Sequence, residues 1–380
     1  MRKARERLLV ISHTNVSVHN QLVFAGLAER GWDVHCVLPD RWVDIYRVKP
    51  FRPSVLPELA ANAIFVPVLF AGSRQRHLYR INAARLVRRV APDVAFMEQE
   101  PFSLPAAQWG AALAAGSVPF GLHSTENLDR RFQLPARLIR RALFPRASFV
   151  AARSARAAAL ARRWGAREPV RFVPHTVPEW EPRASRPRDD ELVIGFVGRL
   201  VDEKGVRDLL AAVKGLSIPA RMVVVGDGPL RAWVEGHDAP AIDVQPGLTT
   251  ESMRDLYASM DVLVVPSRST DKWEEQYGRV LIEAQLCGVP VIGSSSGEIP
   301  WVVASTRGGW IFPEGDVDAL RAAIEHVAED REGAARVGAD GARAAQRLFS
   351  TAHAVEALDE LLHDAMRRSP SDQASTAAPG

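Results

Sequence analysis

The chain has 380 residues, of which 47% are hydrophobic and 24% are charged. This length exceeds the size at which one hydrophobic core stops growing, so two globular domains are expected. The two cysteines, Cys36 and Cys287, exclude a disulfide framework, and no apolar run approaches the ~20 residues that span a membrane.

The net charge of +3 is distributed unevenly along the chain. Residues 1–180 contain 27 Lys and Arg against 13 Asp and Glu, a net of +14, whereas the rest contains 21 against 32, a net of −11. A basic first half favours an anionic partner, such as a membrane surface, a phosphorylated or carboxylated acceptor, or nucleic acid. The alternative is that arginine-rich helices reflect a GC-rich genome.

The basic start, Met1–Arg7, is followed by only four apolar residues and no small-residue cleavage site. This pattern is too short for a signal peptide, so we interpret Leu8–Ser12 as the first strand. We therefore predict a cytoplasmic protein, or one that is peripheral at the inner face of the membrane.

Short apolar runs alternate with helical periodicity in two series. The first predicts strands Leu8–Ser12, Asp33–Leu38, Ala63–Phe70, Asp93–Met97, Val118–His123 and Ser148–Ala152, with helices Asn20–Arg30 and Arg76–Val90. The second predicts strands Leu192–Gly198, Ala220–Val225, Ile242–Gln245, Asp261–Pro266 and Pro290–Ser294, with helices Val206–Val213, Thr250–Ser259, Gly278–Leu286 and Asp318–Asp330. This alternation predicts an α/β protein of two Rossmann-like domains, each with a doubly wound parallel sheet.

The domain boundaries follow from composition. We predict a first domain at 1–178, a Pro-, Arg- and Asp-rich linker at 179–190, and a second domain at 191–345. Helical segments at 346–368 follow and are candidates to pack back on the first domain. The small polar tail at 369–380 is predicted to be disordered.

Two glycine turns follow strands of the second series. In doubly wound sheets, ligands bind at the carboxyl ends of strands. There Gly198 allows a diphosphate to approach the backbone, and Arg199 and Lys204 supply two cations. The alternative is a surface turn with solvated charges. The turn that begins at Gly226 has the same place after a strand, but a plain tight turn fits it equally well.

Two glutamates, Glu275 and Glu283, lie on either side of a helix start near Gly278. The N-terminus of that helix would attract phosphate through its free amides and its dipole. We expect Glu275 in the loop near a donor sugar, and Glu283 on the helix as an acceptor for ribose hydroxyls.

These motifs together resemble the retaining GT-B glycosyltransferases of family 4, also called group 1. The resemblance covers about Leu192–Phe349 and rests on Gly-Arg-Leu-x-x-x-Lys-Gly, Gly-Asp-Gly-Pro, Glu-x7-Glu and Cys-Gly-Val-Pro-Val-Ile-Gly. It implies two domains facing across a cleft. It also implies transfer of a sugar from a UDP- or GDP-sugar to an acceptor hydroxyl with retention, without metal or cofactor. The Asp189-Asp190 pair lies in the linker rather than after a strand, so it predicts no metal site.

The resemblance also implies roles for single residues. The catalytic candidates are Glu275, His123, Arg199 and Lys204, where His123 matches a histidine that approaches the donor sugar in relatives. The donor-binding candidates are Gly198, Arg199, Lys204, Gly226, Gln276, Tyr277, Gly278, Arg279 and Glu283, with the backbone around Gln276–Arg279 holding sugar hydroxyls and phosphate. A structural role for His123 is the alternative.

The first half matches the family more loosely, because the Gly-Gly turn that often follows the first strand is absent from Ser12–Asn20. Asn15 and Asn20 are candidates to replace it, although Asn20 or Ser17 would also suit a helix N-cap. Glu100 and Glu126 follow predicted strands and are candidate acceptor contacts, with loop caps as the alternative.

The basic segment Arg130–Arg146 suits either an anionic membrane surface or packing on the sheet, and we favour packing. No aromatic-rich basic stripe supports nucleic-acid binding. The expected partners are a nucleotide-sugar donor and a hydroxyl-bearing acceptor, anionic or lipid-linked, in cell-envelope polysaccharide or glycolipid synthesis. The alternatives are natural-product (antibiotic) synthesis, an epimerase or phosphorylase on the same architecture, and a non-catalytic nucleotide- or nucleic-acid-binding protein.

Overall fold

The computed structural model describes residues 5–43, 50–178, 180, 191–237, 241–247 and 250–368. The chain divides into unit 1, Met1–Thr176 with Thr351–Gly380, and unit 2, Val177–Ser350. The sequence pattern predicts these divisions at 178 and 345. Apart from Trp180, the predicted linker 179–190, with Asp189 and Asp190, lies outside the described residues, as does the predicted tail 369–380.

A parallel sheet forms the centre of unit 1. Its strands are β1 (Arg7–Ser12), β2 (Asp33–Pro39), β3 (Ala63–Val66), β6 (Val94–Glu98), β7 (Phe120–Ser124), β8 (Phe149–Ala152) and β9 (Val170–Phe172), in the order β3-β2-β1-β6-β7-β8-β9. The middle of β1 is fully buried, as expected for a strand covered on both faces. Because β1 pairs with both β2 and β6, the strand order reverses beside it, which creates a crevice at the carboxyl ends.

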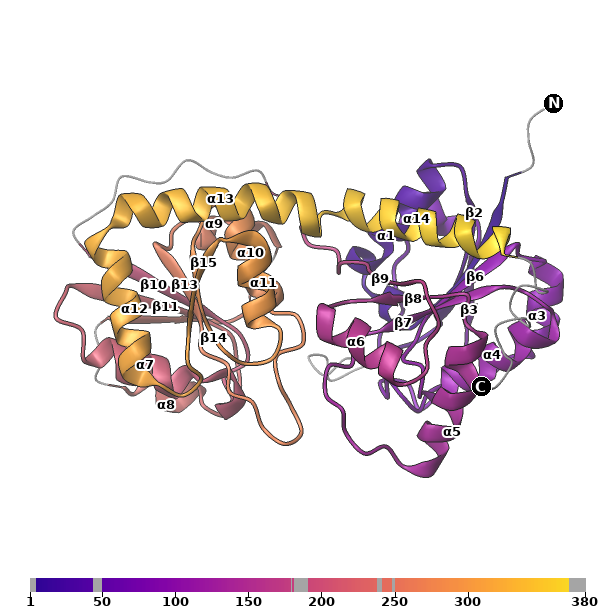
Figure 1. Cartoon of the computed structure of the whole chain (residues 1–380), viewed down its shortest axis with the longest axis horizontal. Coiled ribbons are helices and arrows are strands. Elements are labelled where there is room, and N and C mark those ends of the chain that lie inside the picture. The colour runs from indigo at the N-terminus through magenta and orange to yellow at the C-terminus, as the bar shows by residue number, and fades with distance from the viewer. Residues whose placement is uncertain are drawn as a thin grey trace, which may run out of the picture. The chain divides into compact units, whose positions relative to one another are not determined.

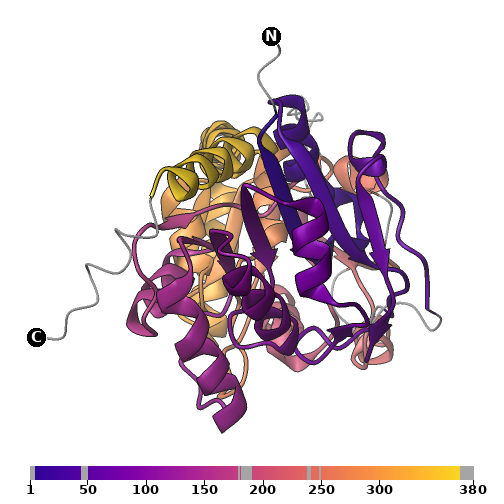
Figure 2. The same cartoon turned by 90° about the vertical axis from the view of Figure 1, so that its right-hand side faces the viewer.

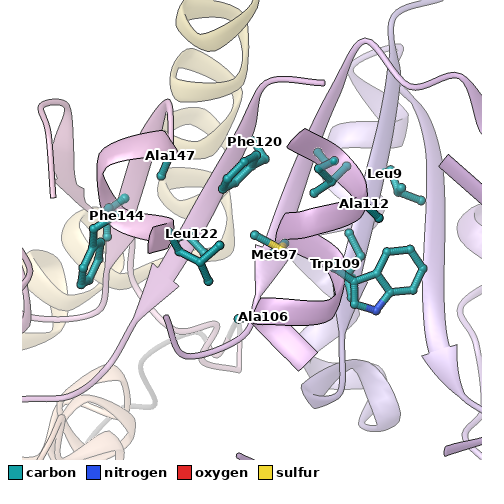
Figure 3. Packing of buried hydrophobic residues seen from close by; sticks show 14 of the residues in the cluster. Leu9, Met97, Ala106, Trp109, Ala112, Phe120, Leu122, Phe144 and Ala147 are labelled. Carbon is teal, nitrogen blue, oxygen red and sulfur yellow. The ribbon is translucent and has the colours of Figure 1, made fainter. Parts of the chain in front are cut away.

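Helices cover both faces of this sheet. They are α1 (Val18–Glu29), α2 (Pro57–Ala60), α3 (Ala83–Val90), α4 (Leu104–Ala115), α5 (Leu134–Leu143), α6 (Ala155–Arg163) and α14 (Thr351–Arg367), with 3-10 turns at Thr14–Val16 and Phe144–Arg146. Ser103 and Ser154 begin α4 and α6, where each hydroxyl accepts a backbone N–H of the first turn. One core lies between the sheet and α4, where Trp109 and Met97 are buried (Figure 3).

The C-terminal helix α14 belongs to unit 1 although it follows unit 2 in the chain. It lies beside α1 (Figure 1) and buries Leu358, Leu361 and Leu362 in the core on the other face of the sheet. A methyl group at Gly26 of α1 would lie 2.6 Å from Val355, so glycine allows the two helices to approach closely.

Unit 2 repeats the architecture. Its strands are β10 (Leu192–Val197), β11 (Ala220–Val225), β12 (Ile242–Gln245), β13 (Val262–Val265), β14 (Val291–Ser294) and β15 (Gly309–Phe312), all parallel in the order β12-β11-β10-β13-β14-β15. The helices are α7 (Val206–Lys214), α8 (Arg231–Glu235), α9 (Thr250–Tyr257), α10 (Arg279–Leu286), α11 (Ile299–Thr306), α12 (Val317–Glu329) and α13 (Arg331–Phe349), with a 3-10 turn η3 at Asp202–Lys204. The strand order reverses between β10 and β13.

The predicted fold class, two doubly wound parallel α/β units, is confirmed, but two elements of unit 1 differ from the predicted ranges. The expected strand Ala63–Phe70 is split at Pro67, which lacks the N–H that a continuous strand requires. The expected helix Arg76–Val90 begins only at Ala83, because Leu78–Tyr79 (β5) pairs with Val68–Leu69 (β4) as a hairpin. No helix among the described residues is long and apolar enough to cross a bilayer.

Candidate functional site

Two glycine turns meet at the carboxyl ends of β10 and β11 in unit 2. The N–H of Gly198 donates to the carbonyl of Val225 at 3.0 Å, and the N–H of Leu200 donates to the carbonyl of Asp227 at 2.9 Å. A methyl group at Gly226 would lie 1.9 Å from the carbonyl oxygen of Gly198, so any side chain would force the turns apart. The two predicted motifs therefore form one backbone platform.

Arg199 follows Gly198 on this platform. Its side chain is exposed, and its guanidinium has no hydrogen-bond or ion-pair partner among the residues that the structure describes. A planar guanidinium with five free N–H donors is suited to bind two oxygens of a phosphate or carboxylate at once.

Lys204 and Glu275 meet beside the carboxyl end of β13. The ammonium Nζ of Lys204 lies 2.5 Å from Glu275 Oε2, which also accepts from the hydroxyl of Ser267 at 3.1 Å. The same ammonium lies 4.8 Å from the centre of the Trp273 ring. Glu275 is in the loop rather than on a helix, and the contact joins two charges that the sequence separates widely.

Gly205 makes this contact possible. Its φ is +69°, and a methyl group there would lie 1.8 Å from the carbonyl oxygen of Pro266. The turn after Lys204 therefore packs directly on the end of β13, which places the ammonium next to the loop that carries Glu275.

The helix α10 begins immediately after Gly278, which has a φ of +63°. Glu283 in its second turn accepts from the hydroxyl of Tyr257 at 2.9 Å and from Arg279 at 3.0 Å. Burial, followed by the neighbouring Glu283 carboxylate, raises the pKa of Tyr257 well above its usual value, so its hydroxyl stays a donor. The Glu283 carboxylate keeps further lone pairs for other donors.

The remaining predicted positions in this loop differ in orientation. Gln276 and Arg279 are exposed, whereas the Tyr277 ring is buried edge-on against Phe349. The Tyr277 side chain is therefore not available to a ligand. The prediction for this position concerned the backbone around Gln276–Arg279, not the side chain.

Gly297 and Glu298, which were not predicted as site residues, pack against the backbone of Glu275. The N–H of Glu298 donates to the carbonyl of Glu275 at 2.9 Å, and a methyl group at Gly297 would lie 2.1 Å from that carbonyl oxygen. Ser267 was also missed. Each of these residues follows a strand at the same edge of the sheet, and that placement is the signal that would have identified them.

In unit 1, a buried ion pair lies at the carboxyl ends of β6 and β8. Arg153 Nη2 donates to Glu98 Oε1 at 2.7 Å, and Glu98 Oε2 accepts from the hydroxyls of Ser12 and Thr14, each at 2.7 Å. The side chains of Arg153 and Glu98 are only 8% and 6% exposed. Arg153 also donates to the carbonyls of two residues after β9, so its position is fixed.

This network determines the protonation of His123 at the end of β7. Arg153 Nε donates to His123 Nε2 at 2.9 Å. Because a guanidinium can only donate, Nε2 must be unprotonated and the ring carries its proton on Nδ1. Burial and then the charge of Arg153 lower the pKa of His123 well below its usual value, so the ring is neutral.

A cluster of aromatic and histidine side chains lies beside this network. The ring of His13 is 5.0 Å from His77 and 5.5 Å from Trp42, and His13 Nδ1 is 2.8 Å from Gln99 Oε1. Burial lowers the pKa of His13 to about 3 and that of His77 to about 4. Both histidines are therefore neutral at physiological pH.

Asn15 lies in the turn after β1. It is fully buried, and neither its side-chain nitrogen nor its oxygen has a partner among the described residues. Its backbone is held by Ser12 and Gln21. An unpaired buried amide costs about 1–3 kcal/mol, so a ligand that reached Asn15 would recover that energy. Asn20 instead donates to the carbonyl of Thr14 and does not cap α1.

Glu100 and Glu126 lie close to the same edge but have different partners. Thr125 donates to Glu100 through its N–H at 3.0 Å and through its hydroxyl, while Glu100 Oε2 is buried without a partner among the described residues. Burial raises the pKa of Glu100 to about 7. Glu126 accepts from Arg130 and from the N–H of Leu128, as a loop-capping carboxylate does.

The predicted residues therefore form two groups, each at the carboxyl edge of its own sheet. Gly198, Gly226, Lys204 and Glu275 are brought together in unit 2. In unit 1, His123 joins Glu98 and Arg153, which were not predicted. Among the described residues, no group of three or more His, Cys, Asp or Glu side chains is placed to hold a metal ion.

This chain is similar in sequence to known glycosyltransferases, mainly in its second half. The family model described as glycosyl transferases group 1 matches residues 179–344. The chain is 35% identical over 150 residues to the 2-deoxystreptamine N-acetyl-D-glucosaminyltransferase of Streptomyces fradiae, covering 37% of this chain and 34% of that protein. It is 32% identical over 180 residues to the D-inositol 3-phosphate glycosyltransferase of Mycolicibacterium smegmatis, covering 44% and 39%. The matches thus span less than half the length of either curated relative.

A solved structure extends the similarity over nearly the whole chain. The Anabaena protein Alr3699/HepE, solved in complex with UDP and glucose, has a TM-score of 0.69 at 16% identity. The match covers 94% of this chain and 100% of that one. At this identity, the similarity confirms the fold class.

Proposed function

Because residues 179–344 match the family model of glycosyl transferases group 1, we propose that this chain belongs to that family and moves a sugar from a nucleotide diphosphate sugar to an acceptor hydroxyl. The observation that carries this proposal is the contact between Lys204 and Glu275, beside the glycine platform and the start of α10. One edge of the sheet thus carries a cation, two glycine turns that a ligand can approach closely, and the N-terminus of a helix. This combination suits a ligand with a diphosphate and a sugar.

In this proposal, unit 2 binds the donor. Arg199 is the exposed cation for the diphosphate, and the N-terminal amides of α10 receive its second phosphate. Lys204 neutralises the phosphate next to the sugar, while Glu275 accepts from sugar hydroxyls. Glu283 accepts from the ribose with the lone pairs that Tyr257 and Arg279 leave unused.

The reaction requires proton transfer from the acceptor and stabilisation of the leaving group. The bond between the anomeric carbon and the diphosphate oxygen breaks, and the acceptor oxygen bonds to that carbon on the same face. The acceptor proton goes to the departing oxygen, whose charge Arg199, Lys204 and the dipole of α10 stabilise. We propose retention of configuration for this reason, in agreement with the family 4 resemblance.

Unit 1 is proposed to bind the acceptor and to approach the donor sugar. His123 is neutral with its proton on Nδ1, so it can donate a hydrogen bond to a sugar oxygen without placing a charge there. Asn15 and Glu100 have buried side-chain atoms without partners, and an acceptor with several hydroxyls would satisfy them. Glu126 is proposed as an indirect contact, because Arg130 occupies it.

We propose an acceptor of cell-envelope polysaccharide or glycolipid synthesis, consistent with the basic first half of the chain. A small natural product is the second candidate, and the name of the Streptomyces fradiae relative, a transferase for 2-deoxystreptamine, favours it.

Calorimetric titration with UDP-, GDP-, TDP- and ADP-sugars tests the donor site. We expect one class to bind, and Arg199→Ala and Lys204→Ala each to weaken that binding at least tenfold, since a charge-assisted hydrogen bond contributes ~1.5–3 kcal/mol. Arg336→Ala is the matched control, because Arg336 is exposed on α13 and lies beside Asp330 and Glu332 rather than beside a residue of the proposed donor site. Equal binding by wild type and Arg199→Ala would remove Arg199 from the site.

Product analysis by mass spectrometry then tests the reaction. Incubation of the bound donor with envelope-lipid and cyclitol acceptors should give a sugar-transfer product. An epimerised donor or a sugar phosphate would contradict transfer. Absence of donor binding across the panel would contradict the proposal itself and favour the non-catalytic alternative.

A further inference from the structure

The helix α5 lies at the lower edge of unit 1 in both views (Figure 1, Figure 2) and has two very different faces. Its inner face packs on α4, where Leu143 is buried and would lie 2.4 Å from a methyl group at Gly110. Arg140 lies 4.3 Å from the ring of Trp164. The sequence pattern favoured packing of this segment on the sheet, and the inner face of α5 does pack against α4.

The outer face of α5 has an unusual composition for a surface helix. Leu134 is 64% exposed and Leu138 is 54% exposed, and the two are one turn apart. At 100° per residue, both point away from Leu143, and Arg137 and Arg141 lie beside them on the same exposed face. Around the helix the order is Arg137, Arg141, Leu134 and Leu138 within about 100°, so the leucines form one side of the exposed face and the arginines form the other.

Arginines dominate the sequence that contains this helix. Residues 130–167 contain eleven arginines and no aspartate or glutamate, although Arg130, Arg153, Arg162 and Arg163 are paired with Glu126, Glu98, Glu168 and Asp129. Among the described residues, Arg131, Arg137 and Arg141 have no ion-pair partner, although the acidic residues elsewhere in unit 1 are largely paired. The outer face of α5 therefore presents exposed apolar area beside arginines that have no counterion among the described residues.

We propose that the outer face of α5 docks this protein on the surface of an anionic lipid bilayer. The leucines insert at the boundary between headgroups and acyl chains, while the arginines bind lipid phosphates. Nucleic acid or an acidic peptide would pair with the arginines but would leave the leucines exposed, so the pattern favours a bilayer. The proposal does not depend on the proposed transfer reaction.

Co-sedimentation of the full chain with vesicles tests the proposal. We expect binding to vesicles of phosphatidylglycerol and phosphatidylcholine, and at least tenfold weaker binding to phosphatidylcholine alone. Arg137→Glu with Arg141→Glu should reduce binding more than tenfold, since each basic residue contributes roughly fivefold. Leu134→Ser with Leu138→Ser should reduce it comparably. All four positions are exposed, so these variants should keep the melting temperature of the wild type.

The control is α3, which carries exposed arginines but no exposed large apolar residue. Arg85→Glu with Arg88→Glu makes the same charge change there and should cost much less binding. Equal loss in the α3 and α5 variants would show that net charge alone drives binding and would overturn the proposal. Unchanged vesicle binding in the leucine variant would overturn it too, in favour of a polyanion.

Insertion can be measured directly. Cys36 and Cys287 are both buried, so a single cysteine in Leu138→Cys can be labelled with an environment-sensitive dye. We expect a blue shift and increased emission on anionic vesicles, with no change on addition of heparin. An unshifted spectrum on vesicles that do bind the protein would place the contact elsewhere.

Discussion

Removing the buried arginine of unit 1 should destabilise that unit selectively. In Arg153→Met, the guanidinium is replaced by an apolar side chain of similar length, while Glu98 stays buried with only Ser12 and Thr14 as donors. Breaking one side of a buried ion pair costs about 3–5 kcal/mol, because an uncompensated charge stays in the interior. The carbonyls that Arg153 contacts after β9 also lose a donor.

This loss is large compared with the ~5–15 kcal/mol by which a typical domain is stable. At a urea dependence of ~2 kcal/mol per molar, the unfolding midpoint of unit 1 should fall by roughly 1.5–2.5 M. Hydrogen exchange of peptides from β6 and β8 across a urea series measures unit 1 separately from unit 2. Arg88→Met, an exposed arginine on α3, is the control and should leave the midpoint unchanged.

The double variant Glu98→Gln with Arg153→Met separates charge from packing. Without a buried carboxylate, it should recover about 2 kcal/mol relative to Arg153→Met alone, although two side chains are then changed. A free energy of unfolding for Arg153→Met within about 1 kcal/mol of the wild-type value would refute the reasoning, because Glu98 would then be solvated or differently paired in solution.

Three further predictions concern pH and backbone geometry. Burial raises the pKa of Glu100 from 4.5 to about 7, so ionisation of Glu100 lowers the stability of the folded state as pH rises through that range. Glu100→Gln should therefore increase the free energy of unfolding in urea by about 2 kcal/mol at pH 8 and by almost nothing at pH 4. Burial lowers the pKa of His77 from 6.5 to about 4, so the folded state loses stability as pH falls below 6.5. His77→Phe should therefore make the urea midpoint less dependent on pH below 6.5. An unaltered slope of the midpoint against pH would contradict this. Gly226→Ala should displace the platform, lower the melting temperature and abolish donor binding in calorimetry, whereas Gly247→Ala, with open space around it, should do neither.

The prediction from sequence worked best where the signal was local. Alternating apolar runs and helical periodicity gave the two doubly wound units, since each run reflects its own burial. The turn after Gly198 and the loop position of Glu275 were also recognisable, because strand-end glycines and charged residues have local signatures. Pro67 was a local signal for the end of a strand, but the strand Ala63–Phe70 was predicted to continue across it. The hairpin that follows Pro67 could not be predicted locally, because it depends on pairing between Leu69 and Leu78.

Other features had no local signal. No pattern in α4, α6 or α11 led to a prediction, because these helices contain apolar residues on nearly every side or many alanines. The burial of the Asn15 side chain without a partner among the described residues and the orientation of Tyr277 depend on neighbours that are distant in the sequence.

The sequence by itself determined the two-unit α/β architecture and the glycine-turn motifs of the proposed donor site, because periodicity and turn chemistry are properties of contiguous residues. Only the tertiary structure decided that Arg153 lies between Glu98 and His123 and that Lys204 meets Glu275. These contacts depend on which strands are neighbours and which helix face is covered. Strand order and helix packing minimise the free energy of the whole chain, so no single segment specifies them.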